Sequence, residues 1–238
     1  MKEYLRRKID SIIYKIEHCY YQLDLFRRKQ IKQYLNNNSV AKLHIGCGKN
    51  IIAGWLNTDI SIKRCKEGAL YLDAGDRFPF PDNSFDYVYS EHLFEHLNYP
   101  QAVNMLSECH RILKHSGVIR ISTPNFRFLV DLYLNPEKPI NKAYICWSAN
   151  GGGGGKTIPE SSIFVINKFH TTWGHKIIYD AETLSNLMRE NGFKDICHCE
   201  ISKSKNTELI NIEGHFKYIP FDYCKLETMI LEAYNDKS

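Results

Sequence analysis

Short apolar runs bounded by Gly, Pro, Asn, Asp or Ser recur along the chain and predict β-strands. Alternation of apolar and polar positions puts Leu43, Ile45 and Val88 in the core of the predicted sheet. Seven such runs are present, at residues 43–45, 55–60, 69–72, 85–90, 118–123, 193–201 and 227–233.

Between these runs, apolar residues recur at helical spacing and polar residues mark the helix ends. Asn98 begins one predicted helix, with Pro100 in its first turn and Gln101 at the capping-box position. Gly117 is expected to follow the end of this helix, and Asp180 to cap a later one. Helices are predicted over residues 3–35, 91–97, 99–114, 126–134 and 181–191.

Strands that alternate with helices predict an α/β fold with a mostly parallel seven-stranded sheet and helices on both faces. The last two predicted strands have no clear helix between them, which indicates an antiparallel edge strand. Residues 135–175 show no clear pattern and are predicted to be an irregular, flexible insertion, with Gly151–Gly155 as a mobile lid or linker. Gly155-Lys156-Thr157 does not complete a P-loop, because Asn150 stands where that motif requires glycine.

Residues 1–38 are predicted to form an N-terminal helical extension, and residues 39–238 the main domain. A heptad-like seam runs through the extension. We expect this helix to pack on the main domain. Dimerisation is an alternative, and so is peripheral membrane contact, because basic residues flank the apolar stripe. The seam consists of Leu5, Ile9, Ile12, Ile16, Cys19, Leu23 and Phe26.

Composition narrows the classes of function. The chain has 238 residues, 43% of them hydrophobic, which is enough for one sizeable domain. It has no long apolar run and no apolar signal core, so we expect a cytoplasmic protein. Residues 1–38 hold nine Lys and Arg against four acids, so the net charge of +4 lies in the extension and nucleic acid is not an expected partner. The eight cysteines include no C-x-x-C pair, so we expect no structural zinc site.

The segment KLHIGCGKNIIAGWLNTDI (residues 42–60) has the features of a nucleoside-binding turn. Gly46 and Gly48 allow a sharp turn and close approach of a ligand, and Asp59 ends the next strand, where a carboxylate can accept ribose hydroxyls. A dinucleotide fingerprint would need a third glycine where Ile51 stands and a more distant acid. A plain turn with Asp59 as a helix cap is the alternative. Residues 49–54 are too few for a crossover helix.

This glycine turn, together with LDAGDRFPFPDNSFDYVYSEHLFEHL and RILKHSGVIRISTPN, resembles class I S-adenosylmethionine (SAM)-dependent methyltransferases over residues 40–130. The resemblance implies a Rossmann-like methyltransferase fold, SAM as cofactor and S-adenosylhomocysteine (SAH) as product. It implies contacts of Gly46 and Gly48 with the methionine part of SAM and of Asp59 with the ribose. The adenine would lie against Asp73 and Ala74, and the sulfonium near Ser90 and Glu91.

The later segment WGHKIIYDAETLSNLMRENGF resembles small methyltransferases encoded among genes for surface-polysaccharide synthesis. That resemblance implies a small-molecule acceptor, a hydroxyl or amine of a sugar, nucleotide-sugar or related metabolite. Two alternatives stay open: a quinone-like or lipid acceptor, and a SAM-binding module without catalysis.

Histidines are the candidates for a general base, because they titrate near neutral pH. His92, Glu95 and His96 are predicted to share one helix face. They could tie the helix to its surroundings, supply a base, or bind a divalent metal, which we do not favour. His170 and His175 flank Trp173 in a loop that, by the resemblance, overhangs the acceptor pocket, where Trp173 and Tyr179 could stack on the acceptor.

Overall fold

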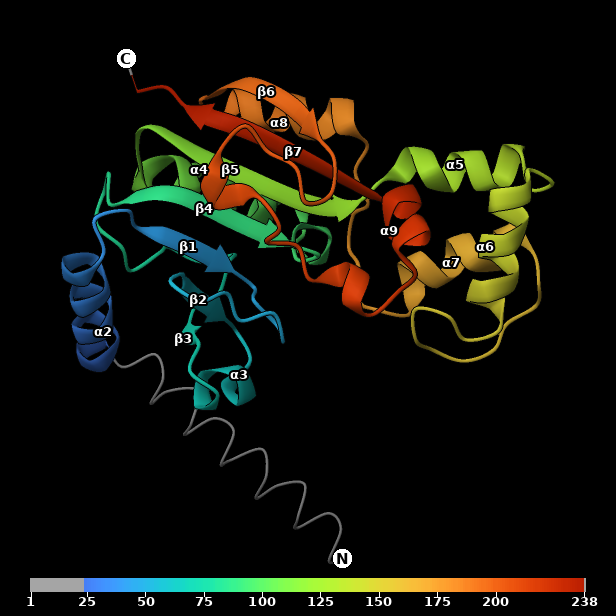
Figure 1. Cartoon of the computed structure of the whole chain (residues 1–238), viewed down its shortest axis with the longest axis horizontal. Helices are drawn as coiled ribbons and strands as arrows, with labels where there is room; N and C mark the ends of the chain where they lie inside the picture. Colours follow the sequence, from blue (N-terminus) through green and yellow to red (C-terminus); the bar gives the residue numbers. More distant parts are fainter. Residues whose placement is uncertain (1–23, 238) are drawn as a thin grey trace, which may run out of the picture.

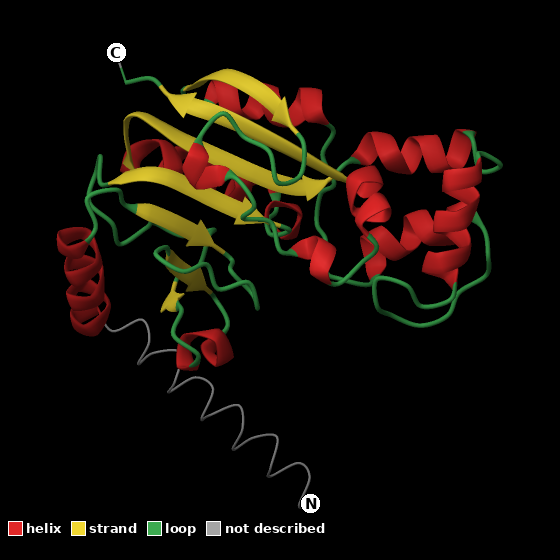
Figure 2. Ribbon diagram, viewed as in Figure 1, coloured by secondary structure: helices red, strands yellow, loops and turns green. Residues whose placement is uncertain are grey.

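The structure, a computed structural model, describes residues 24–237 of the chain. Its centre is a seven-stranded sheet with the order β3-β2-β1-β4-β5-β7-β6 (Figures 1 and 2). All neighbouring strands from β3 to β5 run parallel, and β7 runs antiparallel to both β5 and β6. The predicted fold class is therefore confirmed, with the antiparallel strand one position inside the edge. The strands are β1 (Lys42–Ile45), β2 (Leu56–Asp59), β3 (Leu70–Tyr71), β4 (Phe85–Glu91), β5 (Leu113–Pro124), β6 (Phe193–Cys199) and β7 (Thr228–Asn235).

The connection between β1 and β2 contains no helix, as its length predicts. Helix α3 (Ile62–Lys66) follows β2 instead. The helix predicted over residues 91–97 is wrong in its bounds, because β4 continues to Glu91 and only the 3-10 helix η1 (Phe94–His96) follows. His92 therefore lies outside the helix that it was predicted to share with Glu95 and His96.

Helix α4 (Tyr99–Ile112) begins with the predicted capping box. The Asn98 side chain accepts a hydrogen bond from the Gln101 N–H at 3.0 Å, and the Gln101 side chain accepts one from the Asn98 N–H at 3.1 Å. Gly117 does not end this helix; it lies inside β5, which begins directly after α4. Helices α5 (Phe126–Leu134) and α8 (Ala181–Glu190) lie where the pattern predicts them.

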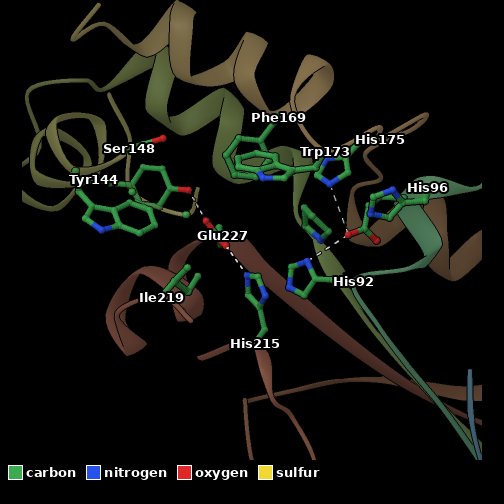
Figure 3. Close-up of a pocket in the computed structure, with 15 residues that line it drawn as sticks. His92, His96, Tyr144, Ser148, Phe169, Trp173, His175, His215, Ile219 and Glu227 are labelled. Atoms are coloured by element: carbon green, nitrogen blue, oxygen red, sulfur yellow. Dashed lines mark hydrogen bonds and ion pairs between the residues drawn. The ribbon is translucent and has the colours of Figure 1, made fainter. Parts of the chain in front are cut away.

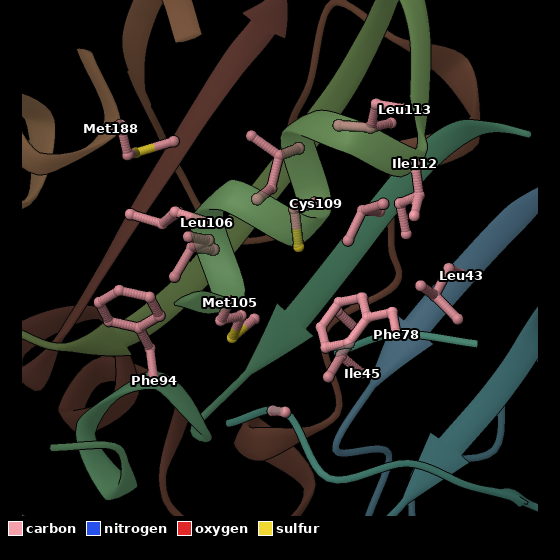
Figure 4. Close-up of a cluster of buried hydrophobic side chains, with 14 of the residues drawn as sticks. Leu43, Ile45, Phe78, Phe94, Met105, Leu106, Cys109, Ile112, Leu113 and Met188 are labelled. Carbon is pink, nitrogen blue, oxygen red and sulfur yellow. The ribbon is translucent and has the colours of Figure 1, made fainter. Parts of the chain in front are cut away.

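One face of the sheet is covered by α4 and α8, and this side holds the main core (Figures 1 and 4). Met105, Leu106 and Cys109 of α4 are fully buried there. They pack with Leu43 and Ile45 of β1, the strand that leads into the glycine turn. Burying this apolar face fixes the strand ends on which the site is built.

The other face of the sheet is covered by residues 200–219, which contain the 3-10 helices η2 (Thr207–Leu209) and η3 (His215–Lys217). Leu209 and Ile212 of this segment pack on Trp55 and Tyr89 of the sheet. We call residues 200–219 the cover segment. The sequence left the stretch around Glu213 unassigned.

A buried ion-pair network fastens the cover segment. Arg120 of β5 has no exposed surface and pairs with Glu213 of the cover segment and Glu232 of β7. Its guanidinium also donates to the carbonyls of Lys203, at 3.0 Å, and Glu200, at 3.2 Å. Because the two carboxylates and the carbonyls satisfy the guanidinium, a charge can be buried here without remaining unpaired.

Four helices form a lobe beyond the carboxyl ends of β4 and β5 (Figure 1). They are α5, α6 (Pro139–Ala149), α7 (Ser162–Thr171) and α9 (Phe221–Glu227). The prediction that residues 135–175 are irregular is therefore wrong for α6 and α7. Both helices bury side chains in a second apolar cluster with α5, and this cluster supplies the order that local pattern did not reveal.

Helix α2 (Asp24–Asn37) is the described part of the predicted extension, and it packs on the main domain through Ile31, which is 3% exposed. The Tyr34 hydroxyl donates to the Lys42 carbonyl at 2.9 Å and so ties α2 to the start of β1. The predicted seam from Leu5 to Leu23 lies outside the described residues, and the Phe26 side chain is also not described. Among the described residues, no helix combines the length and apolar character that crossing a membrane would require.

We predict that Arg120→Met destabilises the fold. The substitution strands two buried carboxylates without their counter-charge, which should cost about 3–5 kcal/mol in free energy of unfolding. Urea denaturation followed by circular dichroism measures this cost. Arg189→Met, at an exposed position on α8, is the matched control and should change stability by less than about 0.5 kcal/mol. Equal stability of the two variants would contradict the assigned role of Arg120.

Candidate functional site

The glycine turn after β1 has a backbone that only glycine adopts easily. Gly46 and Gly48 have φ of +69° and +52°, in the left-handed region. A Cβ at Gly46 would lie 2.1 Å from Leu93 Cδ1 and 3.0 Å from Leu93 Cβ, so no larger residue fits there. A Cβ at Gly48 would meet nothing within 4 Å, which leaves the backbone open for a ligand to approach.

Asp59 organises the turn from the tip of β2. Its Oδ2 accepts a hydrogen bond from the Gly48 N–H at 2.8 Å, and its Oδ1 accepts one from the Ser61 N–H at 2.7 Å. A carboxylate offers about four acceptor positions, so two remain for the hydroxyls of a ribose. The alternative of Asp59 as a helix cap is wrong, because the N-cap residue of α3 is Ser61 and no side chain caps that helix.

Asp73, Ala74 and Ser90 lie at the carboxyl ends of β3 and β4, on the same edge of the sheet as the glycine turn. Asp73 Oδ1 accepts from the Gly75 N–H at 2.8 Å, and Ala74 is buried. The Ser90 hydroxyl is buried and has no hydrogen-bond partner among the described residues. Such an orphaned hydroxyl is costly unless a ligand completes it, so its place beside β1 fits a cofactor crevice.

Glu91 anchors the cover segment. Its carboxylate accepts hydrogen bonds from the N–H groups of Gly214, at 2.9 and 3.0 Å, and of His215, at 3.0 Å. The sequence assigned Glu91 to the cofactor site. In the structure, its carboxylate fixes the backbone of His215 next to the end of β4.

A cavity of about 290 Å³ lies between the ends of β4, β5 and β7 and the helical lobe (Figure 3). We call it the His–Glu cavity. Its polar lining comes from four histidines and two glutamates, and its apolar lining is largely aromatic. The lining residues are His92, Glu95, His96, Pro124, Tyr144, Trp147, Ser148, Gly152, Gly153, Phe169, Trp173, His175, His215, Ile219 and Glu227.

His92 is held in the cavity by a buried carboxylate. Its Nδ1 lies 3.2 Å from Glu95 Oε1, and its Nε2 lies 3.3 Å from Thr228 Oγ1. Glu95 has no exposed surface, and its Oε2 accepts a hydrogen bond from the Thr123 hydroxyl at 3.0 Å. The φ of His92 is +47°, a left-handed conformation that directs the chain from β4 into η1.

The charges around His92 favour its protonated form. Burial by itself lowers the pKa of His92, but the hydrogen bond and charge of Glu95, together with the charges of Glu227 and Glu91, raise that pKa above its usual value. Burial raises the pKa of Glu95, and the opposing effect of His92 outweighs it, so the Glu95 pKa is lowered. The pair is therefore held as an imidazolium and a carboxylate over a wider pH range than either residue alone.

A second His–Glu pair faces the first. His215 Nε2 lies 3.2 Å from Glu227 Oε1, and the Tyr144 hydroxyl donates to the other oxygen of Glu227. The rings of His92 and His215 are stacked, with centroids 3.7 Å apart and planes 29° apart. Two imidazoles, each backed by a carboxylate, thus stand side by side in the cavity (Figure 3).

His96 and His175 complete the histidine lining. His175 Nε2 lies 3.9 Å from Glu95 Oε1, and burial lowers the pKa of His175. The ligand atoms of Glu95, His96 and His175 lie within 4.8 Å of one another. Tetrahedral zinc would need about 3.4 Å between ligand atoms, so the three side chains would have to draw closer together to hold it.

The other predicted acceptor-site residues divide into two groups. Trp173 lines the cavity together with His175. His170 is exposed on α7 and is not among the lining residues, and Tyr179 is 3% exposed and packs on Phe94 in the main core. The structure therefore brings His92, His96 and His175 together and leaves His170 outside.

Part of the glycine run forms a wall of the cavity. A Cβ at Gly152 would lie 2.3 Å from the Trp147 ring, and one at Gly153 would lie 3.3 Å from Trp147 and 3.9 Å from Trp173. Lys168 holds this wall from behind, since its ammonium donates to the carbonyls of Ser148, at 2.9 Å, and Gly152, at 2.8 Å. The run fits against two indole rings because it lacks side chains.

Sequence reasoning missed His215, Glu227, Tyr144 and Trp147. The last two lie on α6, which the Lys138-Pro139 step could have revealed, because proline favours the first helical position. No local signal marks the pairing of His215 with Glu227, which depends on the path of the cover segment across the sheet.

Part of the chain matches a known family model. Residues 43–121 match the family model described as a methyltransferase domain. The match runs from β1 through most of β5, so it includes the glycine turn, Asp59 and His92. No curated protein sequence matches the chain.

Several solved structures resemble the chain. A SAM-dependent methyltransferase from Archaeoglobus fulgidus is 19% identical with a TM-score of 0.46, covering 93% of this chain and 99% of that one. A Haemonchus contortus phosphoethanolamine N-methyltransferase bound to phosphomonomethylethanolamine and SAH is 17% identical with a TM-score of 0.49, covering 87% of this chain and 52% of that one. A possible histamine N-methyltransferase from Thermotoga maritima is 16% identical with a TM-score of 0.45, covering 99% and 100%. TM-scores below 0.5 do not establish a shared acceptor.

We predict that Glu95→Gln lowers the pKa of His92. The amide keeps the shape of the carboxylate but removes its negative charge. Burial, which disfavours the protonated form of His92, is then opposed by fewer negative charges. Histidine ring proton shifts followed by NMR against pH, with His92→Asn to assign the signal, measure the change. Glu190→Gln, exposed on α8, is the control and should leave the His92 titration unchanged. An unshifted His92 pKa in Glu95→Gln would show that Glu95 does not set it.

Proposed function

We propose that this chain, a class I SAM-dependent methyltransferase by its matched domain and its sheet, methylates a small metabolite bound in the His–Glu cavity. SAM is the cofactor and SAH the product. The acceptor group is a hydroxyl or an amine, and the acceptor is a sugar or a related small ring compound. The observation that carries the proposal is the position of His92, which pairs with Glu95 just past the end of the strand that borders the glycine turn, two residues after Ser90.

The path from cofactor to acceptor follows β4. Ser90 is paired with Ile45, the last residue before the glycine turn, so its orphaned hydroxyl lies at the cofactor crevice. His92 follows in the cavity wall, and Leu93 touches the glycine turn itself. An acceptor in the cavity is therefore separated from the crevice by only the tip of one strand.

Bound SAM supplies a methyl group on a sulfonium that is already activated for transfer. The chain has to orient the acceptor and remove its proton, and orientation alone can lower the barrier by about 7–11 kcal/mol. The aromatic walls Trp147, Trp173 and Phe169 can hold a ring by stacking. His215 and, above its raised pKa, neutral His92 are the groups in reach to accept a proton, each oriented by its glutamate.

A role in surface-polysaccharide synthesis rests on the similarity of residues 173–193 to methyltransferases of those gene clusters. A quinone-like or lipid acceptor is the second candidate, and the aromatic character of the cavity favours it. Peripheral membrane contact through the helix predicted at 3–35 would favour that alternative, and dimerisation through the same helix is a separate possibility. The cytoplasm is the proposed location.

The test begins with the cofactor. Calorimetry with SAM and SAH should show one site per chain, and an SAH-release assay over sugar, amino-sugar and quinone acceptors should identify the substrate class. Binding without turnover on any acceptor would instead favour a SAM-binding module. Absence of binding to either nucleoside would remove the proposal.

We predict that Asp59→Asn weakens SAM binding by about 10–100-fold, because charged hydrogen bonds to the ribose become neutral ones. The asparagine oxygen still accepts from the Gly48 N–H, so the turn should keep its fold. Calorimetry with SAM measures the affinity, and thermal denaturation checks the fold. Asp195→Asn, at an exposed residue of β6, is the matched control. Unchanged SAM affinity in Asp59→Asn would argue against the assigned cofactor site.

We predict that His92→Asn lowers turnover by about 10²–10⁴-fold while leaving SAM affinity within about threefold. Asparagine tolerates the left-handed backbone at this position, so the variant removes the imidazole with little added strain. SAH release and calorimetry provide the two measurements. His198→Asn, exposed on β6, should behave like the unaltered chain. Full turnover in His92→Asn would exclude His92 as the base.

A further inference from the structure

We propose that the His–Glu cavity selects an amine acceptor, one that enters as an ammonium cation and carries no phosphate or carboxylate group. This inference rests on the proposed function and narrows its acceptor. It excludes nucleotide-sugars and sugar phosphates, and it ranks an amine above the corresponding hydroxyl compound.

The charged side chains around the cavity favour a cationic acceptor. Glu95 and Glu227 line it, and no Lys or Arg is among its described lining residues. The cation of Lys168 lies behind the wall and is directed at two carbonyls. Glu91 adds a further negative charge behind His215, where two N–H groups hold it. Phosphate groups are ordinarily bound by the guanidinium of Arg or the ammonium of Lys. The cavity offers an anionic acceptor neither of these groups, even when His92 is protonated.

The aromatic walls of the His–Glu cavity also favour a cationic acceptor. Tyr144, Trp147, Phe169 and Trp173 line the cavity, and their ring centroids are spaced as in a packed cluster: Tyr144 to Trp147 is 5.3 Å and Phe169 to Trp173 is 5.5 Å. Aromatic faces attract cations and repel anions, because the ring quadrupole places negative potential over the face. Aromatic walls and buried carboxylates together recognise an alkylammonium group.

The chemistry of methyl transfer favours an amine over a hydroxyl in this cavity. An ammonium acceptor first gives a proton to an unprotonated imidazole, that of His215 or that of His92 above its raised pKa, which leaves a lone pair on the acceptor nitrogen. That lone pair forms the new N–C bond as the S–C bond of SAM breaks, and the bond electrons stay on sulfur to give neutral SAH. The product is an N-methylammonium. A hydroxyl acceptor would instead develop alkoxide charge beside Glu95 and Glu227, and the imidazolium of His92 is already paired with Glu95.

The test uses the full chain saturated with SAH, so that acceptor binding is measured without turnover. Calorimetry compares glucosamine with glucose and glucosamine 6-phosphate, and phenethylamine with 2-phenylethanol. We expect the phosphate-free amine of each set to bind at least about tenfold more tightly than its partners. Equal or tighter binding of the hydroxyl or phosphorylated compounds would overturn the inference.

A variant links the preference to the cavity. Glu227→Gln removes one carboxylate charge and should reduce the ratio of amine to hydroxyl affinity by about tenfold, with SAH affinity unchanged. Glu182→Gln, exposed on α8, is the matched control and should keep the ratio. An unchanged ratio in Glu227→Gln would contradict the role of that carboxylate.

Failure of the inference can be told apart from failure of the proposed function. If SAH does not bind at all, the proposed function is wrong. If SAH binds and the chain methylates glucose or 2-phenylethanol in preference to the amines, the methyltransferase stands and the amine selection is wrong.

Discussion

The buried guanidinium of Arg120 is the interaction on which the site depends. It joins β5 and β7 to the cover segment through Glu213 and Glu232. The cover segment has little regular structure of its own, so its path over the sheet is set by this ion pair, by the Glu91 carboxylate and by apolar contacts through Leu209 and Ile212. Its order therefore comes from contacts with the sheet rather than from a helix ladder of its own.

The position of His215 follows from this fastening. The Glu91 carboxylate accepts hydrogen bonds from the backbone N–H groups of Gly214 and His215. The His215 imidazole is thereby placed on that of His92, with the ring centroids 3.7 Å apart. The paired histidines therefore come from the residue that follows β4 and from a segment more than a hundred residues later in the chain. The helical lobe closes the remaining side with aromatic rings, which makes the cavity a joint product of three parts of the fold.

The cofactor half of the site could be predicted because its residues are close in sequence. Gly46, Gly48 and Asp59 lie within one β-turn-β unit, and the capping box of α4 is set by neighbouring residues. These features obey local rules of backbone conformation and hydrogen bonding. The sheet followed from the apolar pattern for the same reason.

The acceptor half could not be predicted in this way. Glu227 ends α9 and His215 lies in the cover segment, so their contact exists only once the lobe and the cover segment are in place. Helices α6 and α7 each bury a single face, but that face includes the polar side chains of Asn141, Ser148 and Lys168. Large apolar side chains of the same helices, Ile140, Ile163 and Phe164, are exposed, so the apolar periodicity that marks an amphipathic helix is blurred. The grouping of His175 with Glu95 likewise depends on the backbone of residues 176 and 177, whose N–H groups both donate to the Glu95 carbonyl.

The contact between Gly46 and Leu93 has a consequence for how this sequence can vary. Leu93 fills the volume that a side chain at position 46 would require, so the two positions share one fixed amount of space. A larger residue at 46 would need both a smaller residue at 93 and a backbone that tolerates positive φ. Relatives that keep this geometry should therefore change the two positions only together, although three strands, β2, β3 and β4, separate them in the chain.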